Sequence, residues 1–192
     1  MNSINRDAAL ELLTEYNESE SLLNHAFAVE GVMRHFSKKY GGDPDVWGIT
    51  GLLHDLDYEK YPEQHCAKTA EILKEHGYPD EIIRGTMSHG YGICTDVKPE
   101  TEMEKVLYAI DELTGLITAT VYVRPSRSVL DLTVQSVKKK WKQKGFSAGV
   151  NRELIEEGAA KLGMDVGDLI AETIEGMKTV ASEIGLEGTP GE

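Results

Sequence analysis

The amino-acid sequence predicts an all-α protein built as a helical bundle, and three observations support this prediction. Apolar residues recur every three or four positions through most of the 192 residues, which is the spacing of one helix face. Alternating patterns typical of strands are nearly absent, and the one β-rich run, residues 116–123, continues a helical stripe. Residues typical of helix starts and ends separate the periodic segments. A hydrophobic fraction of 40% is enough for a buried core.

The first half of the chain is expected to hold five helices. Ser19 is a candidate N-cap for the second of them, and Gly41-Gly42 ends it. Asp43 followed by Pro44 begins the third, because proline is favoured in the first turn of a helix. The predicted helices cover residues 5–16, 19–40, 43–55, 62–77 and 79–90.

Four further helices are expected after a loop at residues 90–100. They cover residues 101–123, 128–144, 151–162 and 166–184. The last eight residues, GLEGTPGE, are expected to fray, since they are rich in glycine and carry little apolar surface. We divide the chain into a main helical domain, residues 1–123, and a C-terminal helical extension, residues 124–192, that packs on it.

The charge of the chain limits its partners. The net charge of −13 argues against a general nucleic-acid or membrane binder. Residues 121–145 are an exception, because they carry seven Lys and Arg residues and a single Asp. We expect no membrane partner and no stable nucleic-acid partner, and the sequence does not indicate an oligomeric state.

The two cysteines and the N-terminus predict a cytoplasmic protein. Cys66 and Cys94 form no Cys-x-x-Cys pair, which suits free thiols in a reducing compartment. We interpret both as packing residues, because nothing obvious in the sequence activates either thiol. The first residues contain no apolar signal core, and no later stretch reaches transmembrane length.

Side chains suited to metal binding fall on inward helix faces or at predicted helix ends. They are His25, His54, Asp55, His65, His89 and Asp111. Imidazole and carboxylate together suit divalent ions such as Mn, Fe, Co, Ni or Zn, and no cysteine belongs to the set. A divalent ion lowers the pKa of a water that it binds, which generates a nucleophile near neutral pH. With two ions, Asp55 is the natural bridging ligand, because a carboxylate has two oxygens to share.

The order of four of these residues resembles a known signature. His25, then His54-Asp55 in GLLHDL, then Asp111 in YAIDELTG is similar to the H…HD…D pattern of the HD-domain superfamily of metal-dependent phosphohydrolases. The resemblance covers roughly residues 19–123. It implies an HD-domain helical bundle in which these four residues bind the metal.

The two remaining histidines extend that resemblance. His65 and His89 stand where HD hydrolases with two ions carry extra histidine ligands, so the resemblance implies one or two divalent ions. Two departures from the family pattern occur. Tyr58 stands where many relatives have a lysine, and the GYP extension of the cyclic-di-GMP phosphodiesterases is missing.

The leading hypothesis is a metal-dependent phosphohydrolase that acts on a small phosphorylated compound, with a nucleotide as the favoured class. Asp55, Asp57 and His89 are the candidate catalytic residues, and Asp57 or His89 would move a proton. The candidate phosphate contacts are Lys60, Arg84, Arg124 and Arg127, because guanidinium forks match phosphate oxygens.

Two other functions stay open at this point. HD-type scaffolds with two iron ions include oxygenases, and an iron protein that consumes O₂ without releasing phosphate would favour that reading. Alternatively, the ion stabilises a non-catalytic module, in which case metal removal would lower the melting temperature without any turnover to lose.

Overall fold

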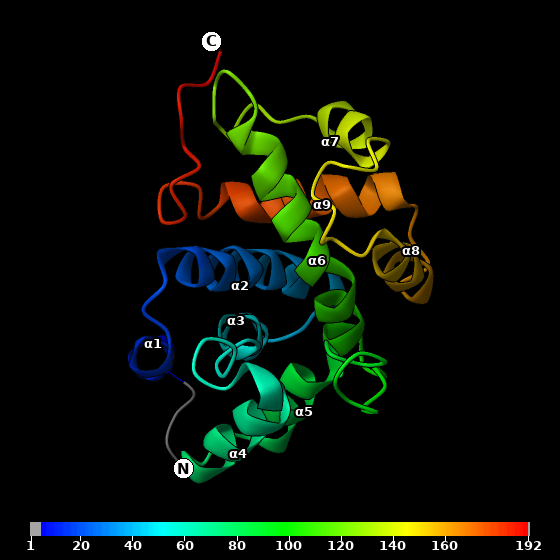
Figure 1. Ribbon diagram of the computed structural model, residues 1–192. Coiled ribbons are helices and arrows are strands. Elements are labelled where there is room, and N and C mark those ends of the chain that lie inside the picture. The colour runs from blue at the N-terminus through cyan, green and yellow to red at the C-terminus, as the bar shows by residue number, and fades with distance from the viewer. Residues whose placement is uncertain (1–4, 192) are drawn as a thin grey trace.

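The structure, a computed structural model, describes residues 5–191 and is built almost entirely from helices (Figure 1). Within this range only an isolated bridge between Tyr91 and Thr95 represents β-structure. The prediction of an all-α fold is therefore confirmed. The helices of the described range are α1 (Arg6–Tyr16), α2 (Glu20–Tyr40), α3 (Pro44–Leu53), the 3₁₀ helix η1 (Pro62–Gln64), α4 (Ala67–Glu75), α5 (Asp80–Ser88), α6 (Glu102–Tyr122), α7 (Val134–Trp141), α8 (Arg152–Lys161) and α9 (Val166–Lys178).

Helix α2 lies in the middle of the molecule (Figure 1). It packs against α3 on one side and against α9 on the other, and α6 crosses it (Figure 1). Its face toward α6 and α9 buries Val29, Val32 and Phe36, which are spaced three and four residues apart as one helix face requires. Because α2 contacts both halves of the molecule, its side chains can reach a site that forms between them.

Two hydrophobic clusters fill the interior on either side of α2. One contains side chains of α1, α3, α4 and α5. The other joins α2 and α6 to α7, α8 and α9. The C-terminal helices thus share one continuous core with α6. This core includes residues on both sides of position 123, where the sequence suggested a boundary.

The helix that carries Asp111, α6, begins at a well-formed N-terminus. Thr101 accepts a hydrogen bond from the backbone N–H of Glu104, and the Glu104 carboxylate accepts one from the backbone N–H of Thr101. This capping box satisfies two backbone donors that the first helical turn leaves open. It fixes where α6 begins and so fixes the register that places Asp111.

Three predicted helix boundaries are wrong. The helix predicted from residue 62 begins only at Ala67. The 3₁₀ helix η1 and a turn at Cys66, whose φ is 68°, replace its first turns. The helix predicted over 128–144 covers Val134–Trp141, with Thr133 as its N-cap. The helix predicted to reach residue 184 ends at Lys178 and continues as turns. Helical spacing of apolar residues does not show where turns replace a helix.

The prediction that the C-terminal tail frays is also wrong within the described residues. Leu186 is buried, and its backbone carbonyl accepts a hydrogen bond from the N–H of Val129. The N–H of Thr189 bonds to the carbonyl of Ser126. The tail therefore runs along the segment that links α6 to α7, where backbone pairing and one buried leucine hold it.

No helix within residues 5–191 combines the length and the apolar character that crossing a bilayer requires.

Close contact between α6 and α8 predicts that Gly→Ala substitutions at two positions will have very different effects on the free energy of unfolding. A Cβ on Gly158 would lie 2.5 Å from the Cα of Ala109, whereas a Cβ on Gly115 would meet nothing within 4 Å. Gly158→Ala should lower the free energy of unfolding by about 1–3 kcal/mol, because α8 must move away from α6. Gly115→Ala, the matched control, should be neutral or raise it by up to about 1 kcal/mol. Urea unfolding of both variants checks this, and equal effects would contradict it.

Candidate metal centre

The six metal-type residues come together at one place although five segments of chain supply them. His25 lies on α2, and His54 and Asp55 follow the end of α3. His65 lies in the turn after η1, His89 directly follows α5, and Asp111 lies on α6. Four of the six residues thus lie just beyond the ends of helices and not within them, where helical periodicity alone does not place side chains.

One half of the centre gathers His25, His54 and Asp111 around one oxygen of Asp55. The Nε2 atom of His25 lies 3.0 Å from Asp111 Oδ1 and 3.2 Å from Nε2 of His54. The Nε2 atom of His54 lies 3.3 Å from Asp111 Oδ1 and 3.4 Å from Asp55 Oδ2. His25 Nε2 is 3.8 Å from that same Asp55 oxygen.

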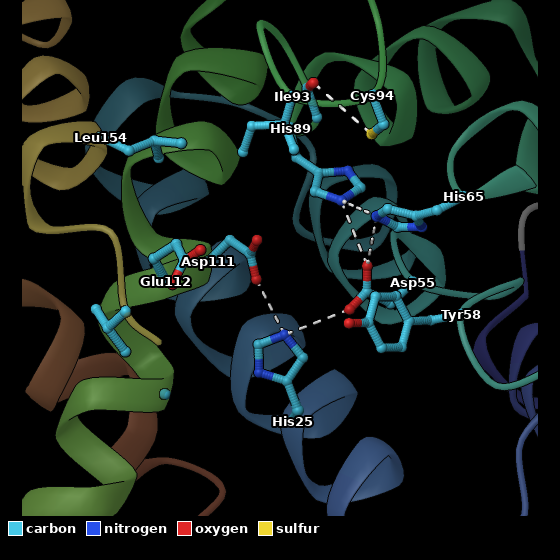
Figure 2. A pocket seen from close by; sticks show the side chains of 13 residues that line it. His25, Asp55, Tyr58, His65, His89, Ile93, Cys94, Asp111, Glu112 and Leu154 are labelled. Atoms are coloured by element: carbon cyan, nitrogen blue, oxygen red, sulfur yellow. Dashed lines mark hydrogen bonds and ion pairs between the residues drawn. The ribbon is translucent and has the colours of Figure 1, made fainter. Parts of the chain in front are cut away.

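The other half gathers His65 and His89 around the second oxygen of Asp55. Their Nε2 atoms lie 3.3 Å apart. Asp55 Oδ1 lies 3.3 Å from His89 Nε2 and 3.5 Å from His65 Nε2. Figure 2 shows these two histidines on one side of Asp55, with His25 between Asp55 and Asp111. Asp55 thus offers one oxygen to each half.

These separations fit divalent metal ions. Ligand atoms that share an ion at about 2.1 Å lie roughly 3.0 to 3.4 Å apart, depending on whether the geometry is octahedral or tetrahedral. Within both halves most neighbouring donor atoms are 3.0 to 3.5 Å apart. The donors are imidazole nitrogens and carboxylate oxygens, which suit Mn, Fe, Co, Ni or Zn. The residues present therefore fit one ion in each half, with Asp55 between them.

Hydrogen bonds on the far side of each imidazole turn its Nε2 lone pair toward the centre. The Nδ1–H of His54 donates to the carbonyl of Gly51, at 2.7 Å, and that of His89 donates to the carbonyl of Thr86. A carbonyl oxygen can only accept, so both rings must carry their proton on Nδ1. Partners of this kind fix the tautomer and orientation of metal-binding histidines.

The remaining two imidazoles are held in the same way. The Nδ1 atom of His65 lies 2.8 Å from a carboxylate oxygen of Asp57. The Nδ1 atom of His25 lies 3.4 Å from Oγ1 of Thr114, whose own proton goes to the carbonyl of Asp111. All four Nε2 atoms therefore face the centre, where each can bind a cation once its ring carries a single proton on Nδ1.

The carboxylates and imidazoles of the centre shift each other's pKa. Burial is the largest influence on the pKa of Asp55, Asp111, His25, His65 and His89, and it disfavours the charged form of each. The neighbouring imidazoles nevertheless outweigh burial and hold the pKa of Asp55 and of Asp111 below the ordinary range. Hydrogen bonds to the carboxylates raise the pKa of His25 and His89 and raise that of His65 to about 10. Until a cation binds, protons on His25, His65 and His89 balance the ionised carboxylates of Asp55 and Asp111.

The donors open into a pocket of about 320 Å³. Tyr58 and Ile93 lie on its wall and are exposed, while Val150 and Leu154 reach it from the C-terminal part of the chain. Among the described residues, those that line this pocket include no lysine or arginine, and Glu112 adds a further carboxylate. Apart from its imidazoles, the described lining therefore offers no cationic side chain.

The four predicted phosphate contacts lie elsewhere and have partners. Lys60 donates to the carbonyl of Glu15, and Arg84 forms ion pairs with Glu100 and Glu104, each at 2.9 Å. Arg124 pairs with Asp131 at 2.8 Å, and Arg127 lies over the ring of Tyr122. A contact between any of the four and a phosphate stays a prediction.

Asp57 lies behind His65 and is fully buried. One of its oxygens meets Nδ1 of His65 and the other accepts the backbone N–H of Thr69, at 2.8 Å each. Both oxygens are thus engaged away from the pocket. We infer that Asp57 positions His65, which differs from the proton transfer suggested by the sequence.

Asp57→Asn should therefore weaken the half of the centre that contains His65. The amide keeps the shape of the carboxylate but loses its charge, so the affinity for the ion in this half should fall roughly 10- to 100-fold. The ion held by His25, His54 and Asp111 should remain. Metal titration by calorimetry, with circular dichroism to confirm folding, checks this. An equal loss of both ions, or no loss, would contradict it.

Sequence reasoning missed several residues of the site. Thr114 is not among the predicted site residues, although its position three residues after Asp111 on α6 places it about one helical turn from that residue. Cys66 is fully buried, as expected of a packing residue, but it also has neighbours that the sequence did not reveal. Burial acts to raise the pKa of its thiol, but hydrogen bonding with His65 and His89 outweighs burial and lowers it to about 6. Only the folded chain brings His89 to this thiol.

Comparison with known proteins agrees with this geometry for part of the chain. Residues 22–116 match the family described as HD domain. The chain is also similar to tRNA (cytidine(56)-2'-O)-methyltransferase of Thermoplasma volcanium, with 25% identity over 136 residues, 68% of this chain and 40% of that protein. Caspase-1-A of Xenopus laevis is 30% identical over 89 residues, 41% of this chain and 23% of that protein. Caspase-4 of Mus musculus is 31% identical over 85 residues, 39% of this chain and 23% of that protein.

The chain spans between about a quarter and two fifths of the length of these relatives. No solved structure matches it. The family match, by contrast, spans all six donor residues, from His25 to Asp111. Residues 22–116, which carry the clustered His and Asp side chains, are thus similar to the HD domain family.

Proposed function

We propose that the protein is a metal-dependent phosphohydrolase that acts on a small phosphorylated compound, with a nucleotide as the favoured class. One observation carries the proposal: two sets of donor atoms share the carboxylate of Asp55 and open into the same pocket. Centres with two neighbouring ions suit the displacement of groups at phosphorus, because they can stabilise both the attacking and the leaving oxygen.

Some residues would bind the ions, and others keep the imidazole rings aligned. His25, His54 and Asp111 would hold one ion, and His65 and His89 the other, with Asp55 contributing to both. When bound, the ions supply Lewis acidity, which lowers the pKa of water and offsets the charge of a phosphoryl group. The carbonyls of Gly51 and Thr86 keep two of the rings aligned throughout.

The pocket supports a small substrate with a polar end and an apolar end. Its volume of about 320 Å³ lies at the lower end of the range for small-molecule sites. The phosphoryl group would face the donor atoms, and the rest of the molecule would lie between Tyr58 and Ile93 on one side and Val150 and Leu154 on the other. We propose that residues 1–123 carry the chemistry and that residues 124–192 supply part of the wall that selects the substrate.

Elemental analysis combined with a phosphate-release screen tests the proposal. The protein would be purified without chelator and offered nucleotides, dinucleoside polyphosphates and sugar phosphates. We expect one or two transition-metal ions per chain and phosphate release from at least one class. An iron protein that consumes O₂ and releases no phosphate would contradict the proposal in favour of an oxygenase. A bound ion without any turnover would contradict it in favour of a module that the ion only stabilises.

A further inference from the structure

The only two cysteines of the chain meet beside the metal centre. The Sγ atoms of Cys66 and Cys94 lie 2.9 Å apart, although 28 residues separate them in sequence. Packed atoms that share no bond usually sit about 3.5–4.0 Å apart. The two sulfurs are therefore already closer than ordinary packing, and both are free thiols.

The local backbone is arranged so that the sulfurs can meet. Gly90 lies next to both, and a Cβ at this position would overlap the sulfur of Cys94 and that of Cys66. Cys66 has φ 68° and ψ −48°, near the rare and strained γ-turn with positive φ. Strain of this kind persists only where the surrounding structure imposes it, and it gathers at functional sites. A missing side chain at Gly90 and a strained residue at Cys66 thus accompany the same contact.

The two thiols differ in their access to solvent. Cys94 is exposed and lines the metal pocket, whereas Cys66 is fully buried behind it. Figure 2 shows Cys94 near His89 at the edge of the pocket. A small oxidant can therefore reach Cys94 first, and Cys66 is in place to react next.

We infer that Cys66 and Cys94 form a reversible disulfide in response to a peroxide, and that this bond weakens the half of the metal centre built on His65 and His89. The Cys94 sulfur attacks one oxygen of hydrogen peroxide, which leaves a sulfenic acid on Cys94 and releases one water. The Cys66 sulfur then displaces the sulfenic oxygen as a second water and forms the S–S bond. Two thiols and one peroxide become one disulfide and two waters, and an added dithiol reverses the change.

The effect on the metal centre follows from the neighbours of each cysteine. Cys66 directly follows His65, and its Sγ lies 4.0 Å from Nε2 of His89. The sulfur separation must contract from 2.9 Å to about 2.0 Å in a disulfide. That contraction is several times larger than the roughly 0.2 Å by which metal–ligand distances usually vary. The histidines of this half should therefore lose alignment, while His25, His54 and Asp111 keep theirs.

The test treats the full chain with hydrogen peroxide and counts its free thiols. We expect the count to fall from two to zero in the monomer, with the mass of one disulfide, and to return with dithiothreitol. Calorimetric titration with Mn²⁺ should show affinity for the second ion reduced roughly tenfold or more in the oxidised protein, and restored on reduction. Cys94→Ser, given the same oxidant, should form no internal disulfide and should keep its Mn²⁺ affinity.

Each contrary result has a distinct meaning. Two thiols that persist under peroxide, or a disulfide that forms only between chains, would overturn the inference. A disulfide that leaves Mn²⁺ affinity unchanged would overturn its link to the metal centre. Only that link rests on the proposed function, since the thiol count does not depend on turnover. A protein that forms the disulfide but releases no phosphate would contradict the proposed function and leave the cysteine chemistry standing.

Discussion

Replacing Asp55 with alanine is expected to remove both bound ions and to lower phosphate release by roughly 10³-fold or more. Asp55 is the residue whose two oxygens face different halves of the centre, with Oδ2 near His54 and Oδ1 near His65 and His89. Loss of a single electrostatic stabilising group in an active site already costs about 10²–10³ in rate. Elemental analysis after gel filtration, together with initial rates on the best substrate of the screen, measures both effects.

Two variants sharpen this experiment. Asp55→Asn keeps the shape of the side chain but removes its charge, and we expect it to fail in the same way. Asp96→Ala removes an exposed carboxylate from the nearby loop and should keep both the ions and the activity. An Asp55→Ala protein with its full complement of metal would show that the shared carboxylate is not what holds the ions.

Removing the metal with a chelator is expected to lower the melting temperature by about 5–10 °C. The donors come from α2, α6 and the ends of three other helical segments, so an ion ties together parts of the chain that packing alone must otherwise hold. A ligand present at 100 times its dissociation constant stabilises the folded state by about 2.7 kcal/mol. For a chain of this size each kcal/mol corresponds to roughly 2–4 °C. Calorimetry before and after chelation, and again after adding metal back, checks the prediction.

The Asp55→Ala protein provides the control for this measurement as well. It should melt at the same temperature with and without chelator, because it has no ion to lose. An unchanged melting temperature of the parent protein on chelation, with metal loss verified by elemental analysis, would contradict the prediction.

The donor residues could be proposed from the sequence because each is a His or Asp that local sequence places on an inward helix face or at a predicted helix end. The predicted helix ranges placed His54 and Asp55 at the end of one helix and His89 at the end of another, and helical spacing placed Asp111 on an inward face. Such signals depend on neighbours within about one helical turn. The all-α fold was predictable for the same reason.

What the sequence did not reveal depends on distant contacts or on unusual backbone. His65 was predicted to lie in a helix, but the chain turns at Cys66 through a positive φ that no periodic pattern encodes. Asp57 was given a catalytic role, yet its partners are Thr69 and a ring eight residues away. The approach of Cys94 to Cys66 depends on how two loops pack.

Val150 and Leu154 come from outside the segment that matches the HD domain family, yet they face the same pocket as the donor atoms. A change at either position alters the surface that an incoming molecule meets without touching any atom that could hold an ion. Preference for one compound over another can therefore drift through mutation in the last third of the chain while the reactive centre stays intact. Proteins that descend from one ancestor could in this way differ in substrate preference and keep the same reactive centre.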